Sequence, residues 1–212
     1  MTTIAILGSG RVSRVLAAAL AGAGHEVLVG SREPGAVSQS WDGPPVNFTD
    51  VRQAVSAAEV VVNATPGESS VERMSELRPE LDGKILVDVA NATRRSGANE
   101  PGGLLYPNSS LAEELQAALP GVRVVKTLNT VLFMVMAAPD SLSTRPTAFL
   151  SGDDDDAKST VRGLLGDIGW SEEHVLDLGG IASARGPEAM ILLVPHIVKA
   201  RGLKPFALTV VS

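Results

Sequence analysis

A glycine turn near the start of the chain constrains its fold more than any other feature. The apolar run Ile4-Ala5-Ile6-Leu7 leads directly into Gly8-Ser9-Gly10, and a stretch with helical periodicity begins at Arg11. A strand, a Gly-x-Gly turn and a helix in this order are typical of the segment that holds the pyrophosphate of a dinucleotide. Gly8 permits the tight turn, Gly10 lets a phosphate approach the backbone, and the start of the helix supplies N–H groups. We therefore predict a dinucleotide site at Gly8, Ser9, Gly10, Arg11 and Val12.

The rest of the chain repeats short apolar runs rich in Val and Ile, with helix-period stretches between them. Runs without polar alternation are typical of strands that are buried on both faces, as in a parallel sheet covered by helices. Strands are predicted at residues 3–7, 26–30, 46–48, 60–64, 85–89, 123–128, 147–150 and 175–178, and helices at 11–21, 50–57, 69–78, 111–119, 130–137 and 154–168. The predicted fold is α/β, a Rossmann-like, doubly wound and mostly parallel sheet.

The pattern changes near the end of the chain. A longer helical stretch is predicted from Ile181 to Ala200, and Pro195 should kink or split it. We expect a nucleotide-binding Rossmann domain at residues 1–178 and a small C-terminal helical portion at 179–212. The segment from Ser96 to Asn108 is rich in Gly and Pro and is predicted to be a loop.

Composition excludes several classes of function. The chain has no Cys and only three widely separated His, so thiol chemistry and a histidine metal centre are not expected. The net charge is −6 and no basic stripe is present, which disfavours nucleic acid, and no apolar run approaches the ~20 residues that a membrane span needs. The acidic run Asp153 to Asp156 falls at a predicted helix N-terminus, where it complements the helix dipole, so no metal site is predicted. We expect a soluble, cytoplasmic protein.

Catalytic side chains are equally hard to find. No Ser occupies a nucleophile elbow, and His25 and His196 fall in a predicted turn and a predicted helix without an identifiable partner. We therefore assign no catalytic residue.

The end of the second predicted strand indicates which nucleotide binds. Ser31 and Arg32 follow Val29-Gly30, at the place where an NAD enzyme positions a carboxylate on the ribose 2′-hydroxyl. A hydroxyl and a guanidinium can instead donate to a 2′-phosphate, and charge-assisted hydrogen bonds contribute about 1.5–3 kcal/mol each. NADPH is therefore favoured over NADH. The alternative is that Arg32 forms only a solvated ion pair with the adjacent Glu33.

Three further turns follow predicted strands and should open on the same edge of the sheet. Ala64, Thr65 and Pro66 follow the fourth strand and Asn91 follows the fifth, and we expect them to border the ribose and nicotinamide. Asn129 and Thr130 follow the sixth strand in Lys126-Thr127-Leu128-Asn129-Thr130. Asn129 is a candidate acceptor-binding residue, and capping of the next helix is the structural alternative.

Several of these segments resemble the F420-dependent NADP oxidoreductases over nearly the whole chain. The similar segments are Ile6-Leu7-Gly8-Ser9-Gly10, Gly24-His25-Glu26-Val27, Val29-Gly30-Ser31-Arg32, Ser151-Gly152-Asp153-Asp154, and Leu176-Asp177 with Gly179 and Arg185. The resemblance implies a Rossmann domain for NADP(H) and a small C-terminal helical portion that helps bind the deazaflavin coenzyme F420 and form a dimer.

One segment resembles a second group. Where deazaflavin-using members tend to carry a His, this chain has Leu128-Asn129-Thr130, and Lys-x-x-Asn-Thr is similar to the cytosolic reductase domain of the six-transmembrane metalloreductases, which passes hydride to a flavin. The acceptor implied by resemblance is therefore either a deazaflavin or a flavin.

Together these observations predict an NADPH-binding oxidoreductase that transfers hydride to a planar deazaflavin or flavin and needs no proton relay of its own. We expect the acceptor pocket between the far side of the Gly8–Gly10 turn and the segment Gly180 to Arg185, which includes Ile181 and Ser183, with Asn129 at its floor. The apolar C-terminal segment predicts a homodimer. Two alternatives stay open: an NADPH-dependent reductase of a small imine or carbonyl, with Lys126 or Tyr106 as the proton donor, and an NADP-sensing module without turnover.

Overall fold

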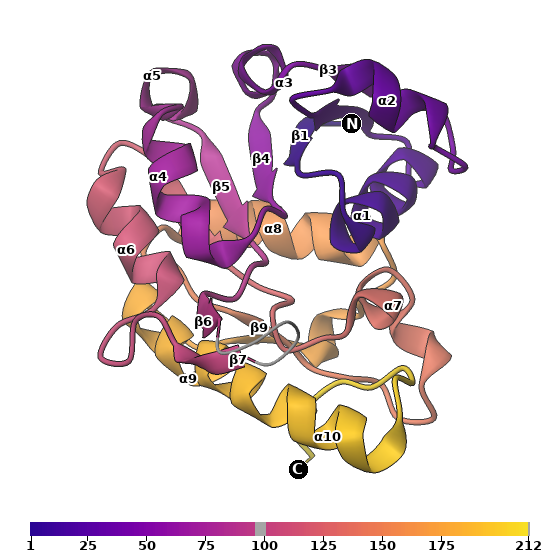
Figure 1. The fold of residues 1–212 in the computed structure, drawn as a ribbon, viewed down its shortest axis with the longest axis vertical. Coiled ribbons are helices and arrows are strands. Elements are labelled where there is room, and N and C mark those ends of the chain that lie inside the picture. Colours follow the sequence, from indigo (N-terminus) through magenta and orange to yellow (C-terminus); the bar gives the residue numbers. More distant parts are fainter. Residues whose placement is uncertain (96–100, 212) are drawn as a thin grey trace.

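A six-stranded parallel sheet forms the centre of the protein. The computed structural model describes residues 1–95 and 101–211 (Figure 1). The strands lie in the order β3 (Asn47–Thr49), β2 (Glu26–Gly30), β1 (Thr3–Leu7), β4 (Val60–Asn63), β5 (Ile85–Asp88) and β8 (Arg123–Lys126). Every pair of neighbours is parallel. This order reverses beside β1 and is that of a Rossmann sheet, so the predicted α/β fold is confirmed.

Helices cover both faces of the sheet because the strands are apolar throughout. In β1, Ile4 and Ile6 pack on one face with Leu16 of α1 (Arg11–Gly22) and Val161 of α8 (Asp155–Asp167). On the other face, Leu7 packs with side chains from α3 (Val51–Ala57), α4 (Ser70–Ser75) and α6 (Leu111–Ala118). Burying a side chain of this size stabilises the fold by about 1.5–3 kcal/mol. The short helix α2 (Pro34–Gln39) follows β2.

Two of the predicted strands lie outside the main sheet. β9 (Ala148–Leu150) and β10 (Val175–Asp177) form a separate parallel pair. An isolated antiparallel bridge between Lys126 and Ser151 connects this pair to β8. In this bridge Ser151 and Lys126 exchange both main-chain hydrogen bonds, at 2.8 and 3.1 Å, and these bonds hold the end of β9 against the end of β8.

The Gly- and Pro-rich segment contains regular structure, so the prediction of a loop over Ser96 to Asn108 is wrong in part. β7 (Pro101–Leu104) pairs antiparallel with β6 (Thr93–Arg95), and residues 96–100 lie outside the described part of the chain. Backbone pairing in so short a ribbon does not depend on a side-chain pattern, and Pro is tolerated at the first residue of a strand.

Two predicted helices are shorter than expected. The stretch 69–78 divides into the turn Gly67–Ser69, α4 and α5 (Arg78–Leu81), with Pro79 in the first turn of α5. The stretch 130–137 is reduced to α7 (Phe133–Met136), which is followed by the turn Pro139–Ser141. The main-chain N–H of Leu132 donates to Phe206, so the preceding residues pair with the C-terminal segment instead of continuing the helix.

The C-terminal helical stretch is a chain of short turns. It comprises Ile181–Ala184, α9 (Arg185–Ala189), Met190–Leu193 and α10 (Val194–Arg201). Pro195 lies in the first turn of α10, where its missing N–H leaves no partner unsatisfied. Figure 1 shows α9 and α10 (yellow) along the edge of the molecule opposite α2 and α3.

Two side chains considered at the sequence level have structural partners. The prediction that His25 has no partner is wrong. Its Nε2 lies 3.0 Å from Asp167 at the end of α8, and its Nδ1 accepts from the N–H of Thr2. The acidic run lies at the N-terminus of α8 as predicted, and Asp154 also caps this helix by accepting from the N–H of Ala157. The turn Glu172–His174 precedes β10.

Candidate functional site

The turn between β1 and α1 brings its backbone very close to the backbone of the turn after β4. Gly8 has φ +121°, and a Cβ at this position would lie 2.6 Å from the carbonyl oxygen of Ala64. Only glycine fits there. Gly10 is extended and caps α1 without a side chain, and no atom lies within 4 Å of the position that its Cβ would occupy. The backbone at Gly10 is therefore open on the side where a side chain would project, while Ser13 is buried where the third glycine of the motif would pack.

The end of β2 carries the residues predicted to select the nucleotide. The main chain of Ser31 donates to Thr49, and its hydroxyl accepts from the N–H of Glu33. Within residues 1–95 and 101–211, Arg32 forms no ion pair with Glu33 or with any other carboxylate. The structure therefore contradicts the alternative in which Arg32 forms only a solvated ion pair with Glu33.

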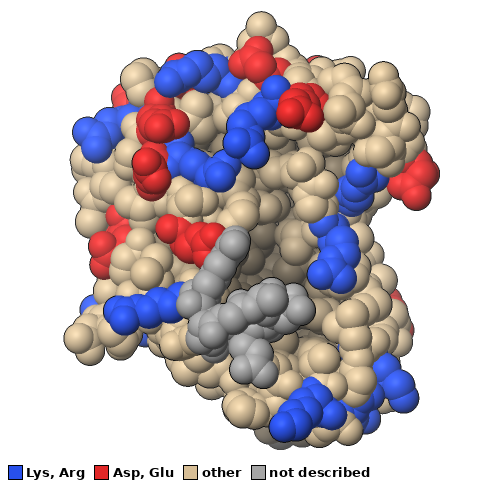
Figure 2. All heavy atoms as spheres, viewed as in Figure 1, with Lys and Arg blue, Asp and Glu red and all other residues tan. Residues whose placement is uncertain are grey.

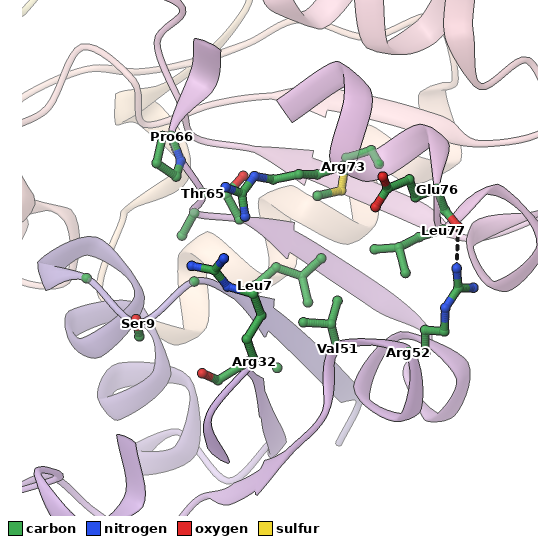
Figure 3. A pocket seen from close by; sticks show the side chains of 16 residues that line it. Leu7, Ser9, Arg32, Val51, Arg52, Thr65, Pro66, Arg73, Glu76 and Leu77 are labelled. Carbon is green, nitrogen blue, oxygen red and sulfur yellow. Dashed lines mark hydrogen bonds between the residues drawn. The ribbon is translucent and has the colours of Figure 1, made fainter. Parts of the chain in front are cut away.

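A large cavity joins these two turns to the turn after β4. It has a volume of about 650 Å³ (Figure 3). The predicted residues that line it are Gly8, Ser9, Gly10, Ser31, Arg32, Ala64, Thr65 and Pro66. Figure 2 shows Lys and Arg side chains at the rim of a hollow on this face of the molecule. The structure therefore brings most of the candidate nucleotide residues to one cavity.

Other lining residues were not identified from the sequence. They are Leu7, Gly30, Val51, Arg52, Arg73, Met74, Glu76 and Leu77. Of these, Arg73 projects from α4, the helix that follows the β4 turn. The available signal was an arginine six residues after the strand-end Thr65-Pro66-Gly67, and by itself it is indistinguishable from an ordinary surface position.

Three predicted nucleotide residues do not line this cavity. The guanidinium of Arg11 lies over the ring of Phe133, 4.7 Å from its centroid, and Val12 packs against the core. Asn91 instead pairs with Asn129: each side-chain amide donates to the other residue, at 2.9 Å in both directions. Asn129 therefore does not cap α7, whose N-cap is Leu132 without a side-chain bond.

The predicted acceptor residues are divided between two places. Asn129 and Thr130 border a small apolar cavity beneath the C-terminal turns, formed with Met190, Ile191, Leu193, Val194, Ile197, Phe206 and Leu208. The buried hydroxyl of Thr130 has no hydrogen-bond partner in the described part of the chain. Gly180, Ile181 and Ser183 lie elsewhere: the N–H of Ile181 donates to Asp153, and the hydroxyl of Ser183 donates to Ser151.

A buried polar network lies behind the β4 turn. The ammonium of Lys126 contacts Asp88 at 2.7 Å and Glu188 at 2.9 Å, and all three side chains are buried. Asp88 also accepts from Asn63, whose own side-chain oxygen accepts from the hydroxyl of Thr65 at 2.6 Å. A continuous set of hydrogen bonds thus holds Thr65 at the cavity wall.

The sequence and the fold have counterparts among known proteins. Residues 3–92 match the family described as NADP oxidoreductase, coenzyme F420-dependent. A crystal structure from Arthrobacter sp. FB24, of a provisionally named F420-dependent NADP-reductase, is 37% identical, covers 100% of both chains and superposes with a TM-score of 0.92. The chain belongs to the F420-dependent NADP oxidoreductase family.

Two curated relatives extend the comparison. Metalloreductase STEAP3 of Rattus norvegicus is 35% identical over 190 residues, which are 89% of this chain and 36% of that protein. The F420-dependent NADP reductase of Methanocaldococcus jannaschii is 27% identical over 68% of this chain and 63% of its own length. The chain thus spans about a third of the metalloreductase that it matches.

The matching family is described as one of NADP oxidoreductases, and two of the relatives above are named as NADP reductases. Both resemblances expected from the sequence are confirmed by these relatives. In the described ranges, none of the helices combines the length and the apolar character that a membrane crossing requires.

Proposed function

We propose that this member of the family transfers hydride between NADP(H) and a deazaflavin or flavin, with the nucleotide held in the 650 Å³ cavity. The observation that carries the proposal is the convergence in that cavity of the Gly8–Gly10 turn, Ser31 with Arg32, and the Thr65–Pro66 turn. Bound NADPH supplies the hydride, and the protein positions the ring.

The residues present fit the nucleotide. The open space at Gly10 exposes the N-terminus of α1, where oriented N–H groups and the helix dipole favour a phosphate. Ser31 and Arg32 stand at the ribose position of a Rossmann site, and no carboxylate occupies that position. These side chains support NADP(H) over NAD(H).

The acceptor side of the proposal rests on Asn129, Thr130 and the C-terminal portion at residues 179–212. The unpartnered Thr130 hydroxyl and the polar edge of Asn129 offer hydrogen bonds beside an apolar wall. The cavity beside them is only about 10 Å³, too small for a planar heterocycle, so binding of the acceptor there requires the C-terminal turns to move apart. Gly180, Ile181 and Ser183 stay part of this proposal as the turn that begins the C-terminal portion.

Purified protein and NADPH, mixed in turn with coenzyme F420, FMN, FAD, a cyclic imine and a small ketone, test the proposal. We expect NADPH absorbance to fall only with the deazaflavin or a flavin. Oxidation of NADPH by the imine or ketone alone would favour the alternative reductase. Tight NADPH binding without consumption of any acceptor would favour a sensing module.

We also propose a homodimer formed through the C-terminal turns. Met190, Leu192 and Leu193 are 38%, 39% and 45% exposed in the single chain. These large apolar side chains follow one another on one segment, and contiguous exposed apolar groups mark contact surfaces.

A further inference from the structure

Arg73 is held with its guanidinium directed into the nucleotide cavity. It lies on α4, is half-buried, and its Nε donates to the hydroxyl of Ser69 at 2.9 Å. That bond uses the inner side of the guanidinium and leaves the two terminal nitrogens directed at the cavity. Figure 3 shows the side chain extending along the cavity wall toward Thr65.

Arg32 enters the same cavity from the opposite wall. Its side chain rises from the end of β2, and the guanidinium groups of Arg32 and Arg73 both point into the opening (Figure 3). Across residues 1–95 and 101–211, neither group forms an ion pair. Two positive charges therefore share a cavity without a compensating carboxylate between them.

The third arginine of the cavity is arranged differently. Arg52 pairs with the carboxylate of Glu80 and donates to the main-chain oxygen of Glu76 at 2.9 Å. The carboxylate of Glu76 lies farther along the wall from both free guanidinium groups in Figure 3. The uncompensated charge of the cavity is thus confined to Arg32 and Arg73.

Like charges that face one cavity repel each other, and an anion placed between them removes the repulsion and accepts hydrogen bonds from both. The diphosphate of a dinucleotide belongs at the start of α1, near Gly10, where N–H groups already face it. The group expected beside Ser31 and Arg32 is the 2′-phosphate, a compact anion with several acceptor oxygens.

We infer that Arg73 is a specificity-determining residue that binds the 2′-phosphate of NADP(H) together with Arg32, an inference that rests on the proposed function. The two guanidinium groups would hold the phosphate from opposite walls, and Ser69 would orient Arg73. Selection of NADP(H) over NAD(H) then depends on α4 as well as on the end of β2.

Calorimetric titration with NADP⁺ and NAD⁺, which differ only in the 2′-phosphate, tests the inference without any acceptor. For Arg73→Met we expect NADP⁺ affinity to fall about ten- to a hundredfold and NAD⁺ affinity to change less than about twofold. Arg73→Lys should restore part of the loss, and Ser69→Ala should cause a smaller one. Arg78→Met is the matched control, because Arg78 is exposed and donates to Ala118 outside the cavity.

Each other outcome overturns the inference. Unchanged NADP⁺ affinity in a folded Arg73→Met protein would remove Arg73 from the site, and equal losses for NADP⁺ and NAD⁺ would place it on the adenine or the diphosphate. A wild type without preference for NADP⁺ would overturn the proposed nucleotide selection as well. A wild type that prefers NADP⁺ and an Arg73→Met variant that keeps this preference would overturn only the role of Arg73. Thermal unfolding of each variant establishes that it is folded.

Discussion

The buried ammonium of Lys126 lies 2.7 Å from the carboxylate of Asp88 and joins β8 to β5 at the edge of the sheet that carries the candidate site. Glu188 of α9 contacts the same ammonium and also accepts the main-chain N–H groups of Leu111 and Ala112 at the start of α6. One cation therefore connects the central sheet with the C-terminal turns.

We expect Lys126→Met to destabilise the protein by about 3–5 kcal/mol, because it leaves two carboxylates buried without their counter-charge. Chemical denaturation measures the change. Arg145→Met, which removes an exposed pair with Asp140, should change the free energy of unfolding by about 1 kcal/mol or less. Similar values for the two variants would contradict this role of Lys126.

Arg32→Ala should lower NADPH affinity about ten- to a hundredfold and leave NADH affinity nearly unchanged, since the guanidinium faces only the 2′-phosphate in our proposal. Calorimetry with both nucleotides, on wild type and variant, measures the difference. Equal affinities of the wild type for NADPH and NADH would refute the proposed selection.

Substitution by Val should affect stability differently at Gly8 and at Gly10, the two glycines of the turn between β1 and α1. Gly10→Val meets no neighbouring atom, so the protein should fold but lose both NADPH and NADH, because the side chain fills the space at the start of α1. In Gly8→Val the new side chain collides with the Ala64 carbonyl, and Val must also adopt a positive φ. This variant should also lose stability, because the backbone strain alone lowers the free energy of unfolding by about 1–3 kcal/mol. Thermal unfolding and nucleotide titration separate these effects. Retained nucleotide binding by Gly10→Val would move the diphosphate elsewhere.

Arg185 holds Glu113 through two hydrogen bonds, of 2.8 and 2.6 Å, and these bonds lower the pKa of the Glu113 carboxyl. A carboxyl whose pKa is lower in the folded protein stabilises it above the unfolded pKa, and this contribution disappears as the pH falls through the folded pKa. The difference in melting temperature between wild type and Glu113→Gln should therefore be largest near neutral pH and narrow below about pH 4. A difference that stays constant between pH 7 and about pH 3 would show that the pair does not titrate in this way.

Light scattering tests the proposed homodimer. We expect the mass of two chains for the wild type and a shift toward a single chain for Leu193→Lys, because a charge within the exposed apolar segment opposes its burial. Asp42→Lys is a suitable control, since Asp42 is exposed on a different part of the chain. A wild-type protein that is monomeric at micromolar concentration would refute the dimer.

The glycine turn and the end of β2 could be predicted because each has a local cause. A strand, Gly8 and Gly10 are sufficient to specify the turn, and Ser31 with Arg32 follows the next strand at a fixed place in this fold. The central sheet was predictable for the same reason, since its strands are apolar without interruption.

Long-range pairing explains what could not be predicted. The pairing of Asn91 with Asn129 joins residues 38 positions apart, and the β6–β7 ribbon depends on backbone bonds rather than on side-chain pattern. Arg73 was missed because its role depends on which wall of the cavity α4 forms. The shortening of the helix before residue 137 depends on a contact with Phe206, which no local pattern around Leu132 reveals.

The close approach of Gly8 to Ala64 reduces the conformational entropy that the site loses when a ligand binds. Because a Cβ on Gly8 would lie only 2.6 Å from the Ala64 carbonyl, the turns after β1 and β4 are already in contact and need no rearrangement to meet. Most of the conformational entropy lost on capture then comes from the long side chains of Arg32 and Arg73, about 0.5–1.5 kcal/mol for each that becomes fixed. The backbone side of the cavity is preorganised, and the arginine side adjusts to the ligand.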